Sequence, residues 1–533
     1  MLSLPELPPI LYLCIWFFAP FRQNLTVIGR DDVLLFLGFL LTTALAMLFL
    51  HRRSSSRYGS CIGLTTVLVL STQYGYLYNF FAIRKLLPVA PETLHGILLV
   101  FLGVAFALFF LALRKSALNL LHLIKILNVY LLTLTLLIAI EAASEIRSAA
   151  ALPPPPSVSV SQSFSPPILS SGTFPDVYCL VLDGFARNDV LSELYSFDNS
   201  SFTAFLRDRG FYVAEQSTSN YPHTYLSLLA LLEGGYVNDA FDRLFTPEDL
   251  ARRMSANPTA ASFVQHGYGI LCFKNGRDSP NISPNAQFLT EDSLDLHIFT
   301  EMNLAYAIFP ACASLVPHWV MDNIATGVRR LISPLRGHQD RIRFFLREVA
   351  TAPKSAAPQF VFLHIICPHA PFVFDRDGRE TTPPHTFGFN DNLLPPDNYI
   401  ESYISQLQFL QNRICNVVEA LQNRQRERMR PVVILLCSDH GPASRMIEGE
   451  IERTNLKERF SNLTAVYFPD QNYALMNPRI SLVNLFRVVR SKLFGESLPL
   501  LENKNYFVSG KIVFPPISSA TASLIDITDR LKP

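Results

Sequence analysis

The chain has 533 residues, of which 49 % are hydrophobic and 17 % charged, and its formal net charge is +1. Its length exceeds that of one ordinary domain and predicts at least two units. The near-neutral charge and the lack of a long basic run with interleaved aromatic residues exclude a nucleic-acid-binding protein. The eight cysteines are scattered and contain no Cys-x-x-Cys pair, so neither a disulfide framework nor a zinc knuckle is predicted.

Apolar residues are concentrated before residue 150, in stretches near 8–21, 33–50, 61–82, 94–113 and 119–142. Four of them reach the roughly 18 residues that a membrane-spanning helix needs, whereas the first is shorter and contains Pro20. The loops after the second and fourth stretches carry arginine and lysine and are therefore expected in the cytoplasm. We predict a transmembrane domain of about five helices over residues 1–145, with everything that follows outside the cytoplasm.

A linker rich in proline, serine and alanine is predicted over residues 146–173, where an extended spacer is expected. From residue 174 to 533, apolar runs alternate with amphipathic segments. Strands are predicted at Val177–Leu182, Gly269–Phe273, Phe360–Ile366, Val432–Cys437 and Thr464–Phe468. A helix is expected between the third and fourth strands, with apolar residues from Ile404 to Leu421 spaced three or four apart. This alternation predicts an α/β fold with a mostly parallel central sheet covered by helices.

Two of the predicted strands end in residues that could bind a metal. Asp183-Gly184 follows the first strand, and Ser438-Asp439-His440-Gly441 follows the fourth. The carboxyl ends of parallel strands meet at one edge of a sheet, and two carboxylates with an imidazole suit one divalent cation. Each motif alone is weak, since an Asp-Gly pair after a strand is more often a simple turn.

A hydroxyl group begins the next notable segment. Thr224 precedes a short apolar run that ends at Gly234, as expected for a helix with a glycine cap. The amino end of a helix favours a phosphate group or a phosphorylated side chain. The alternative interpretation is that Thr224 only caps the helix.

The combination of these motifs resembles the alkaline phosphatase/sulfatase superfamily over roughly residues 174–495. The resemblance implies that Thr224 is the nucleophile. It also implies that Asp183, Thr224, Asp439 and His440 hold one divalent ion, which would be Zn, Mn or Mg.

Within the superfamily, two branches fit poorly. The run after Thr224 lacks the proline and arginine of the formylglycine signature of sulfatases, and His440 is the last histidine, so the two-zinc site cannot be completed. The pattern is similar to lipoteichoic acid synthases and lipid A phosphoethanolamine transferases, although these commonly have Glu where this chain has Asp183.

Three further histidines are candidates for contact with the substrate. His369 follows the third strand in a loop bounded by prolines, and the resemblance implies a histidine against the substrate phosphate near this position. His364 lies inside the strand, and a role as a hydrogen-bonded core residue is as consistent with this position as a contact with the substrate. His223 adjoins Thr224 and ranks third, because its ring could face solvent.

The resemblance implies phosphoryl transfer through a phosphothreonine, from a phospholipid head group to an envelope glycan or glycolipid. It also implies a bacterial inner membrane protein with its C-terminal domain on the periplasmic or extracellular side. Two alternatives stay open. One is a hydrolase of phosphoric or sulfuric esters, and the other is a non-catalytic sulfatase-like membrane protein of envelope assembly.

Overall fold

The computed structural model describes residues 4–21, 40–41, 43–50, 52, 58–69, 97–98, 100–102, 104, 120–150, 174–242, 245–273, 282–289, 334–352, 355–381, 396–510 and 522–532. The chain divides into two units. The first comprises residues 1–158 and 292–337, and the second comprises residues 159–291 and 338–533.

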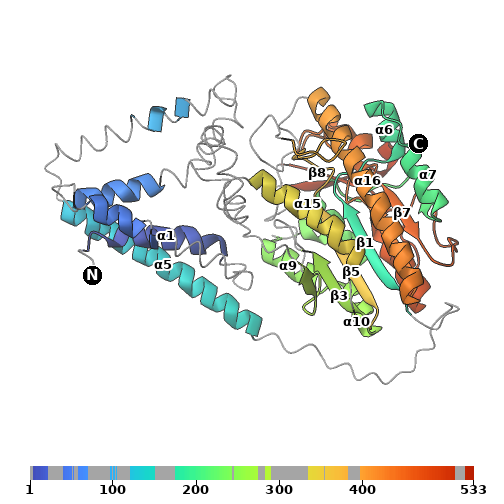
Figure 1. The fold of residues 1–533 in the computed structure, drawn as a ribbon, viewed down its shortest axis with the longest axis horizontal. Helices are drawn as coiled ribbons and strands as arrows, with labels where there is room; N and C mark the ends of the chain where they lie inside the picture. Colours follow the sequence, from blue (N-terminus) through green and yellow to red (C-terminus); the bar gives the residue numbers. More distant parts are fainter. Residues whose placement is uncertain are drawn as a thin grey trace. The chain divides into compact units, whose positions relative to one another are not determined.

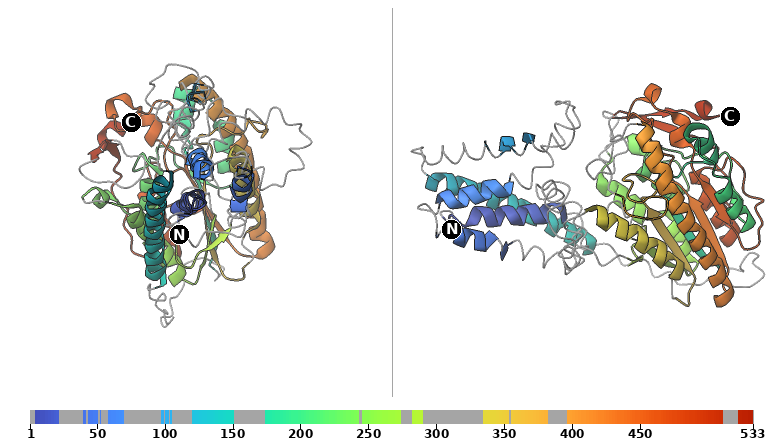
Figure 2. Two further views of the ribbon diagram at one scale, coloured as in Figure 1. Left: turned by 90° about the vertical axis from the view of Figure 1, so that its left-hand side faces the viewer. Right: turned by 45° about the horizontal axis from the view of Figure 1, so that its top comes forward.

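In the first unit, helices α1 (Leu7–Phe21) and α5 (Leu120–Ala150) pack against each other (Figures 1 and 2). The Asn128 side-chain amide donates to the Leu4 carbonyl at 3.0 Å. These helices coincide with the first and fifth apolar stretches, and α5 extends to Ala150, into the first five residues of the predicted 146–173 linker. Much of the other three stretches and residues 151–173 of that linker lie outside the described residues. No helix in the described part of the chain combines the length and apolar character that a membrane crossing requires. The boundaries 1–145, 146–173 and 174–533 stay predictions.

The second unit is built on a seven-stranded sheet in the order β2-β7-β6-β1-β5-β3-β4 (Figure 1). Strand β1 pairs in parallel with β5 and β6, and β3 pairs in parallel with β4 and β5. The predicted α/β class with a mostly parallel sheet is confirmed, and β7 is antiparallel to both of its neighbours. The strands are β1 (Asp176–Leu182), β2 (Tyr212–Val213), β3 (Gly269–Phe273), β4 (Gln287–Leu289), β5 (Gln359–Ile365), β6 (Val432–Cys437) and β7 (Thr464–Tyr467). A separate antiparallel pair joins β8 (Tyr506–Ser509) to β9 (Ser523–Asp526).

Helices cover both faces of this sheet. On one face, α8 (Thr224–Glu233), α10 (Pro258–Gln265) and α18 (Leu482–Phe494) share a buried apolar cluster with alternate residues of β1. On the other lie α15 (Pro334–Thr351) and α16 (Pro396–Arg428), which contains the predicted helix (Figures 1 and 2). The Tyr178 hydroxyl, on the opposite side of β1, donates to the Ala352 carbonyl just after α15. The fully buried β1 therefore packs on both faces, which explains its continuous apolar sequence.

The strand register determines where the polar motifs meet. In the parallel pairing of the two central strands, Val181 of β1 lies opposite Cys437 of β6. Both strands then end, so the turn that carries Asp183 and the turn that carries Asp439 leave the sheet side by side. The other described α-helices of the second unit are α6 (Asn188–Tyr195), α7 (Ser200–Asp208), α9 (Pro247–Ser255) and α17 (Leu456–Phe460).

Candidate active site and metal centre

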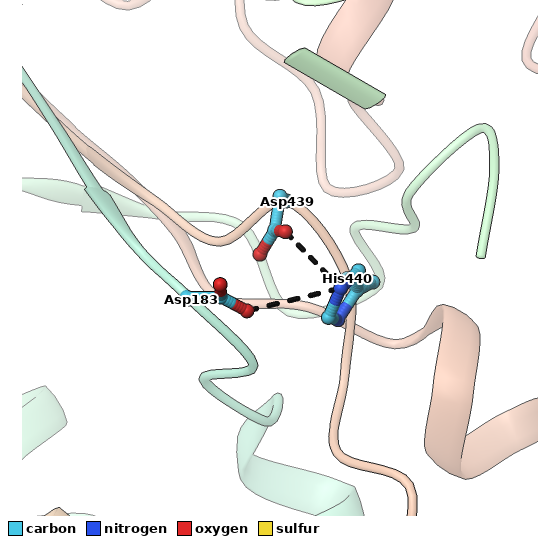
Figure 3. A group of neighbouring side chains, drawn as sticks. All are labelled: Asp183, Asp439 and His440. Carbon is cyan, nitrogen blue, oxygen red and sulfur yellow. Dashed lines mark ion pairs between the residues drawn. The ribbon is translucent and has the colours of Figure 1, made fainter. Parts of the chain in front are cut away.

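The side chains of Asp183, Asp439 and His440 form a buried cluster at the carboxyl ends of β1 and β6 (Figure 3). His440 Nε2 lies 3.1 Å from Asp439 Oδ2 and 3.8 Å from Asp183 Oδ1. All three residues are no more than 4 % exposed. Two neighbouring carboxylates with so little contact with water require a compensating positive charge.

The cluster fits a divalent cation. The oxygens Asp183 Oδ1 and Asp439 Oδ2 are buried and accept no hydrogen bond from the described part of the chain. One potential ligand atom from each residue lies within 4.8 Å of the other two. A tetrahedral site with bonds of about 2.0–2.1 Å places its ligands about 3.3 Å apart. The observed separations of 3.1 and 3.8 Å bracket that value.

The backbone sets the tautomer of His440. Its Nδ1 lies 3.0 Å from the Gly441 carbonyl oxygen, which can only accept, so a neutral ring carries its proton on Nδ1. The lone pair is then on Nε2, the nitrogen that faces the two carboxylates. Histidine ligands of metal ions are commonly oriented by such a hydrogen bond from the other ring nitrogen.

Ser438 ties the two turns together. Its hydroxyl accepts a hydrogen bond from the Phe185 amide at 2.8 Å and donates to the His440 carbonyl at 2.6 Å. The Gly184 amide donates to Asp439 Oδ1 at 3.2 Å. Asp439 is thus oriented through one oxygen, and its other oxygen faces His440.

Thr224 is the first residue of α8, and its hydroxyl oxygen lies 3.1 Å from His440 Nε2. The N-cap residue is His223, which makes no side-chain capping bond, so the alternative that Thr224 caps the helix is wrong. Gly234 ends the helix in the left-handed conformation, as predicted. The structure therefore brings the hydroxyl, the partial positive charge of the helix amino end and the cluster together.

The histidine of the third predicted strand and the histidine of the loop after it both lie at the site. His364, on β5, is buried with Nε2 3.2 Å from Asp183 Oδ2. The His369 amide donates to the Asp183 carbonyl, and its ring centroid lies 6.1 Å from that of His440. His369 Nδ1 is 2.6 Å from the Ala370 carbonyl oxygen, so a neutral ring presents Nε2 as an acceptor.

His223 does not face solvent. It is 9 % exposed, and its Nε2 lies 3.6 Å from Oε1 of Glu448. Burial lowers the pKa of His223, Glu448 opposes this shift, and the positive charge of Arg459 adds to it. The expectation that this ring could point to solvent is corrected because the segment after His440 brings Glu448 beside it.

Sequence reasoning missed His338 and Arg459. His338 is buried on α15, where burial, Arg341 and His369 lower its pKa to about 3. Arg459 on α17 places Nη2 3.1 Å from His440 Nε2. Neither residue lies in a recognisable motif or follows a predicted strand. Only the tertiary fold brings them to the cluster.

The close approach of neighbouring backbone atoms explains why a glycine, Gly441, follows the Asp-His pair. A Cβ atom at this position would lie 2.0 Å from the Glu458 carbonyl oxygen and 2.9 Å from that of Ser461. Gly441→Ala is therefore expected to lower the free energy of unfolding by at least about 3 kcal/mol, because backbone atoms must move. Chemical denaturation would measure this.

The matched control is Gly235→Ala, where the added Cβ meets nothing within 4 Å. We expect this control to change the free energy of unfolding by less than about 1 kcal/mol. Equal effects of the two substitutions would contradict the steric explanation.

No family model matches the sequence, and no curated protein matches it. The integral membrane lipooligosaccharide phosphoethanolamine transferase A (EptA) from Neisseria meningitidis is 16 % identical, with a TM-score of 0.41, over 92 % of this chain and 95 % of that one.

The C-terminal periplasmic domain of EcEptC from Escherichia coli, solved in complex with Zn, is 12 % identical with a TM-score of 0.40, over 67 % of this chain and 94 % of that one. The 2-O GAG sulfatase BT1596 is 11 % identical with a TM-score of 0.39, over 63 % of this chain and 78 % of that one. The three structures are of two phosphoethanolamine transferases and one sulfatase.

Proposed function

We propose that this chain is a metal-dependent transferase that moves a phosphoryl-linked group through a covalent phosphothreonine at Thr224. The observation that carries the proposal is the position of the Thr224 hydroxyl, 3.1 Å from His440 Nε2 in the acidic cluster. A hydroxyl is a weak nucleophile, and it needs both activation and nearby positive charge to attack phosphorus. The first turn of α8 supplies part of this charge.

Asp183, Asp439 and His440, together with the Thr224 hydroxyl, would hold the cation. Two carboxylates, one imidazole and one hydroxyl are a ligand set that Zn²⁺ or Mn²⁺ accepts, and Mg²⁺ fits less well because it prefers oxygen ligands. The bound ion supplies Lewis-acid stabilisation of the charge on the phosphoryl oxygens. His364 then fixes the orientation of Asp183, since its Nε2 lies against the second carboxylate oxygen.

With a cation bound, the Thr224 hydroxyl would give up its proton to water. In the first half-reaction, the resulting Thr224 alkoxide oxygen attacks phosphorus and the bond from phosphorus to the leaving oxygen breaks. A His369 ring that is protonated on both nitrogens donates its Nε2 proton to that oxygen. In the second half-reaction, an acceptor hydroxyl gives its proton to His369 and attacks the phosphothreonine, which regenerates Thr224. The amide groups at the amino end of α8 stabilise the phosphoryl oxygens in both steps.

We propose that a phospholipid head group donates the phosphoryl-linked group and that an envelope glycan or glycolipid accepts it. The apolar stretches before residue 145 support this assignment, because an anchored enzyme and a lipid head group share one surface. The arginine and lysine residues of the loops after the second and fourth apolar stretches support a position of the second unit on the periplasmic or extracellular side of a bacterial inner membrane.

The test combines intact-mass analysis of the purified full-length protein with an assay on head-group-labelled phospholipid. We expect an adduct on Thr224 when acceptor is omitted, and transfer of the label when a glycolipid acceptor is added. Label released to water at the same rate with and without acceptor would indicate the hydrolase. Turnover without any adduct would contradict the covalent route, and a lack of both metal and turnover would favour the non-catalytic alternative.

A further inference from the structure

A buried guanidinium group joins the loop of the nucleophile to the loop of the histidine ligand. Arg459 is 5 % exposed, and its Nε donates to the Pro222 carbonyl at 2.8 Å, two residues before Thr224. Its Nη1 donates to the Gly441 carbonyl at 3.1 Å. These bonds hold the guanidinium plane from two sides and fix the direction of the third nitrogen, Nη2.

Nη2 of Arg459 competes with a metal ion for Nε2 of His440. Arg459 Nη2 lies 3.1 Å from His440 Nε2, and the Thr224 hydroxyl lies 3.1 Å from the same nitrogen. Because His440 Nδ1 carries the proton, Nε2 has a single lone pair. A bound cation takes that lone pair, so Nη2 can no longer donate to it.

The bonds of the guanidinium group to Pro222 and Gly441 do not involve His440 Nε2, so they hold the group in place when a cation binds to that nitrogen. Because Nη2 and the Thr224 hydroxyl each lie 3.1 Å from His440 Nε2, the Nη2 donor stays within about 6 Å of the oxygen that attacks phosphorus. A charged N–H in a buried site makes a strong hydrogen bond to a phosphoryl oxygen, and arginine suits such oxygens better than lysine.

We propose that Arg459 contacts the phosphoryl group of the substrate, and that its Nη2 exchanges His440 Nε2 for a phosphoryl oxygen once the cation is bound. This inference rests on the proposed function, and it adds a residue that the motifs do not contain. It also predicts two opposite effects of one substitution. Loss of the guanidinium group removes a competitor and a like charge from the cation, but it removes a partner from the anion.

The experiment measures both affinities on the purified full-length protein and on the variants Arg459→Gln and Arg459→Lys. Zn²⁺ affinity is obtained by chelator competition, and the binding of inorganic phosphate to the desalted Zn²⁺-loaded protein is obtained by calorimetry. The matched control is Arg253→Gln, because Arg253 is also a largely buried arginine but pairs with Glu233 and Asp239.

We expect Arg459→Gln to bind Zn²⁺ about three- to tenfold more tightly and phosphate at least about tenfold more weakly than the unmodified protein. Arg459→Lys should fall between the two, and Arg253→Gln should match the unmodified protein in both measurements. If Arg459→Gln does not fold, Arg459→Lys tests the inference. It keeps the positive charge but lacks the planar guanidinium group, so its phosphate affinity should fall.

Unchanged phosphate affinity in the Arg459 variants, with Zn²⁺ bound by the unmodified protein, would overturn this inference and leave the proposed function intact. A parallel fall in both affinities would also overturn it, since that result indicates a role confined to holding the loops. Failure of the unmodified protein to bind Zn²⁺ or Mn²⁺ would instead overturn the metal-dependent function, and this inference with it.

Discussion

Replacing Thr224 by alanine is expected to reduce turnover by at least about 1,000-fold and to abolish the phosphorylated adduct. The substitution removes the hydroxyl that lies at the amino end of α8 and against His440. Thr224→Ser keeps the oxygen and should retain part of the activity. The measurements are the rate of label transfer and the intact mass of protein quenched during turnover.

Ser227→Ala is the matched control for this experiment. Ser227 is a buried hydroxyl residue of the same helix, but it donates to the Tyr221 carbonyl at 2.9 Å. Its loss is expected to cost about 1 kcal/mol of stability and to leave the adduct intact. An active Thr224→Ala variant, or an adduct that persists in it, would end the covalent mechanism.

Replacing Asp439 by asparagine is expected to remove the stabilisation that a divalent ion gives to the fold. The substitution keeps the shape of the side chain but removes one of the two carboxylates of the cluster. A ligand at 100 times its dissociation constant stabilises the folded state by about 2.7 kcal/mol. The unmodified protein should therefore melt several degrees higher with Zn²⁺ or Mn²⁺ than after chelation, whereas Asp439→Asn should not respond to either ion.

The control lies at the other end of the same sheet. Asp176 is also a buried carboxylate, at the start of β1, where it accepts a hydrogen bond from the Gln359 amide at 3.0 Å. Asp176→Asn is expected to lower stability but to keep the metal-dependent increase in melting temperature. If Asp439→Asn responds to metal as the unmodified protein does, the cation does not bind at this cluster.

The sequence was most informative at the centre of the sheet. Strand β6 was predicted with the correct ends, and β1 and β5 to within one residue, because their continuous apolar runs require burial on both faces. The short strands β2 and β4 were not predicted, since two or three residues carry no periodicity. The direction of β7 was also not predictable, because an apolar run looks the same in a parallel and an antiparallel pair.

The candidate site was predictable to the extent that its residues follow strands or begin a helix. Asp183, Asp439 and His440 meet because β1 and β6 are neighbours in register. Arg459 and Glu448 reach the site through long-range packing of the segment after His440, and nothing in their local sequence indicates it. His364 was equally compatible with a core role, and only its 3.2 Å distance from Asp183 places it at the cluster.

The amide of Gly184 and the carboxylate of Asp439 are hydrogen-bonded across 255 residues of chain. The cluster therefore cannot form until synthesis has passed β6 and the two central strands have paired, which is a slow, non-local step in folding. A nascent chain would carry the isolated motifs without their combined reactivity. Under the proposed function, this order of assembly keeps the Thr224 nucleophile inert until the second unit has folded.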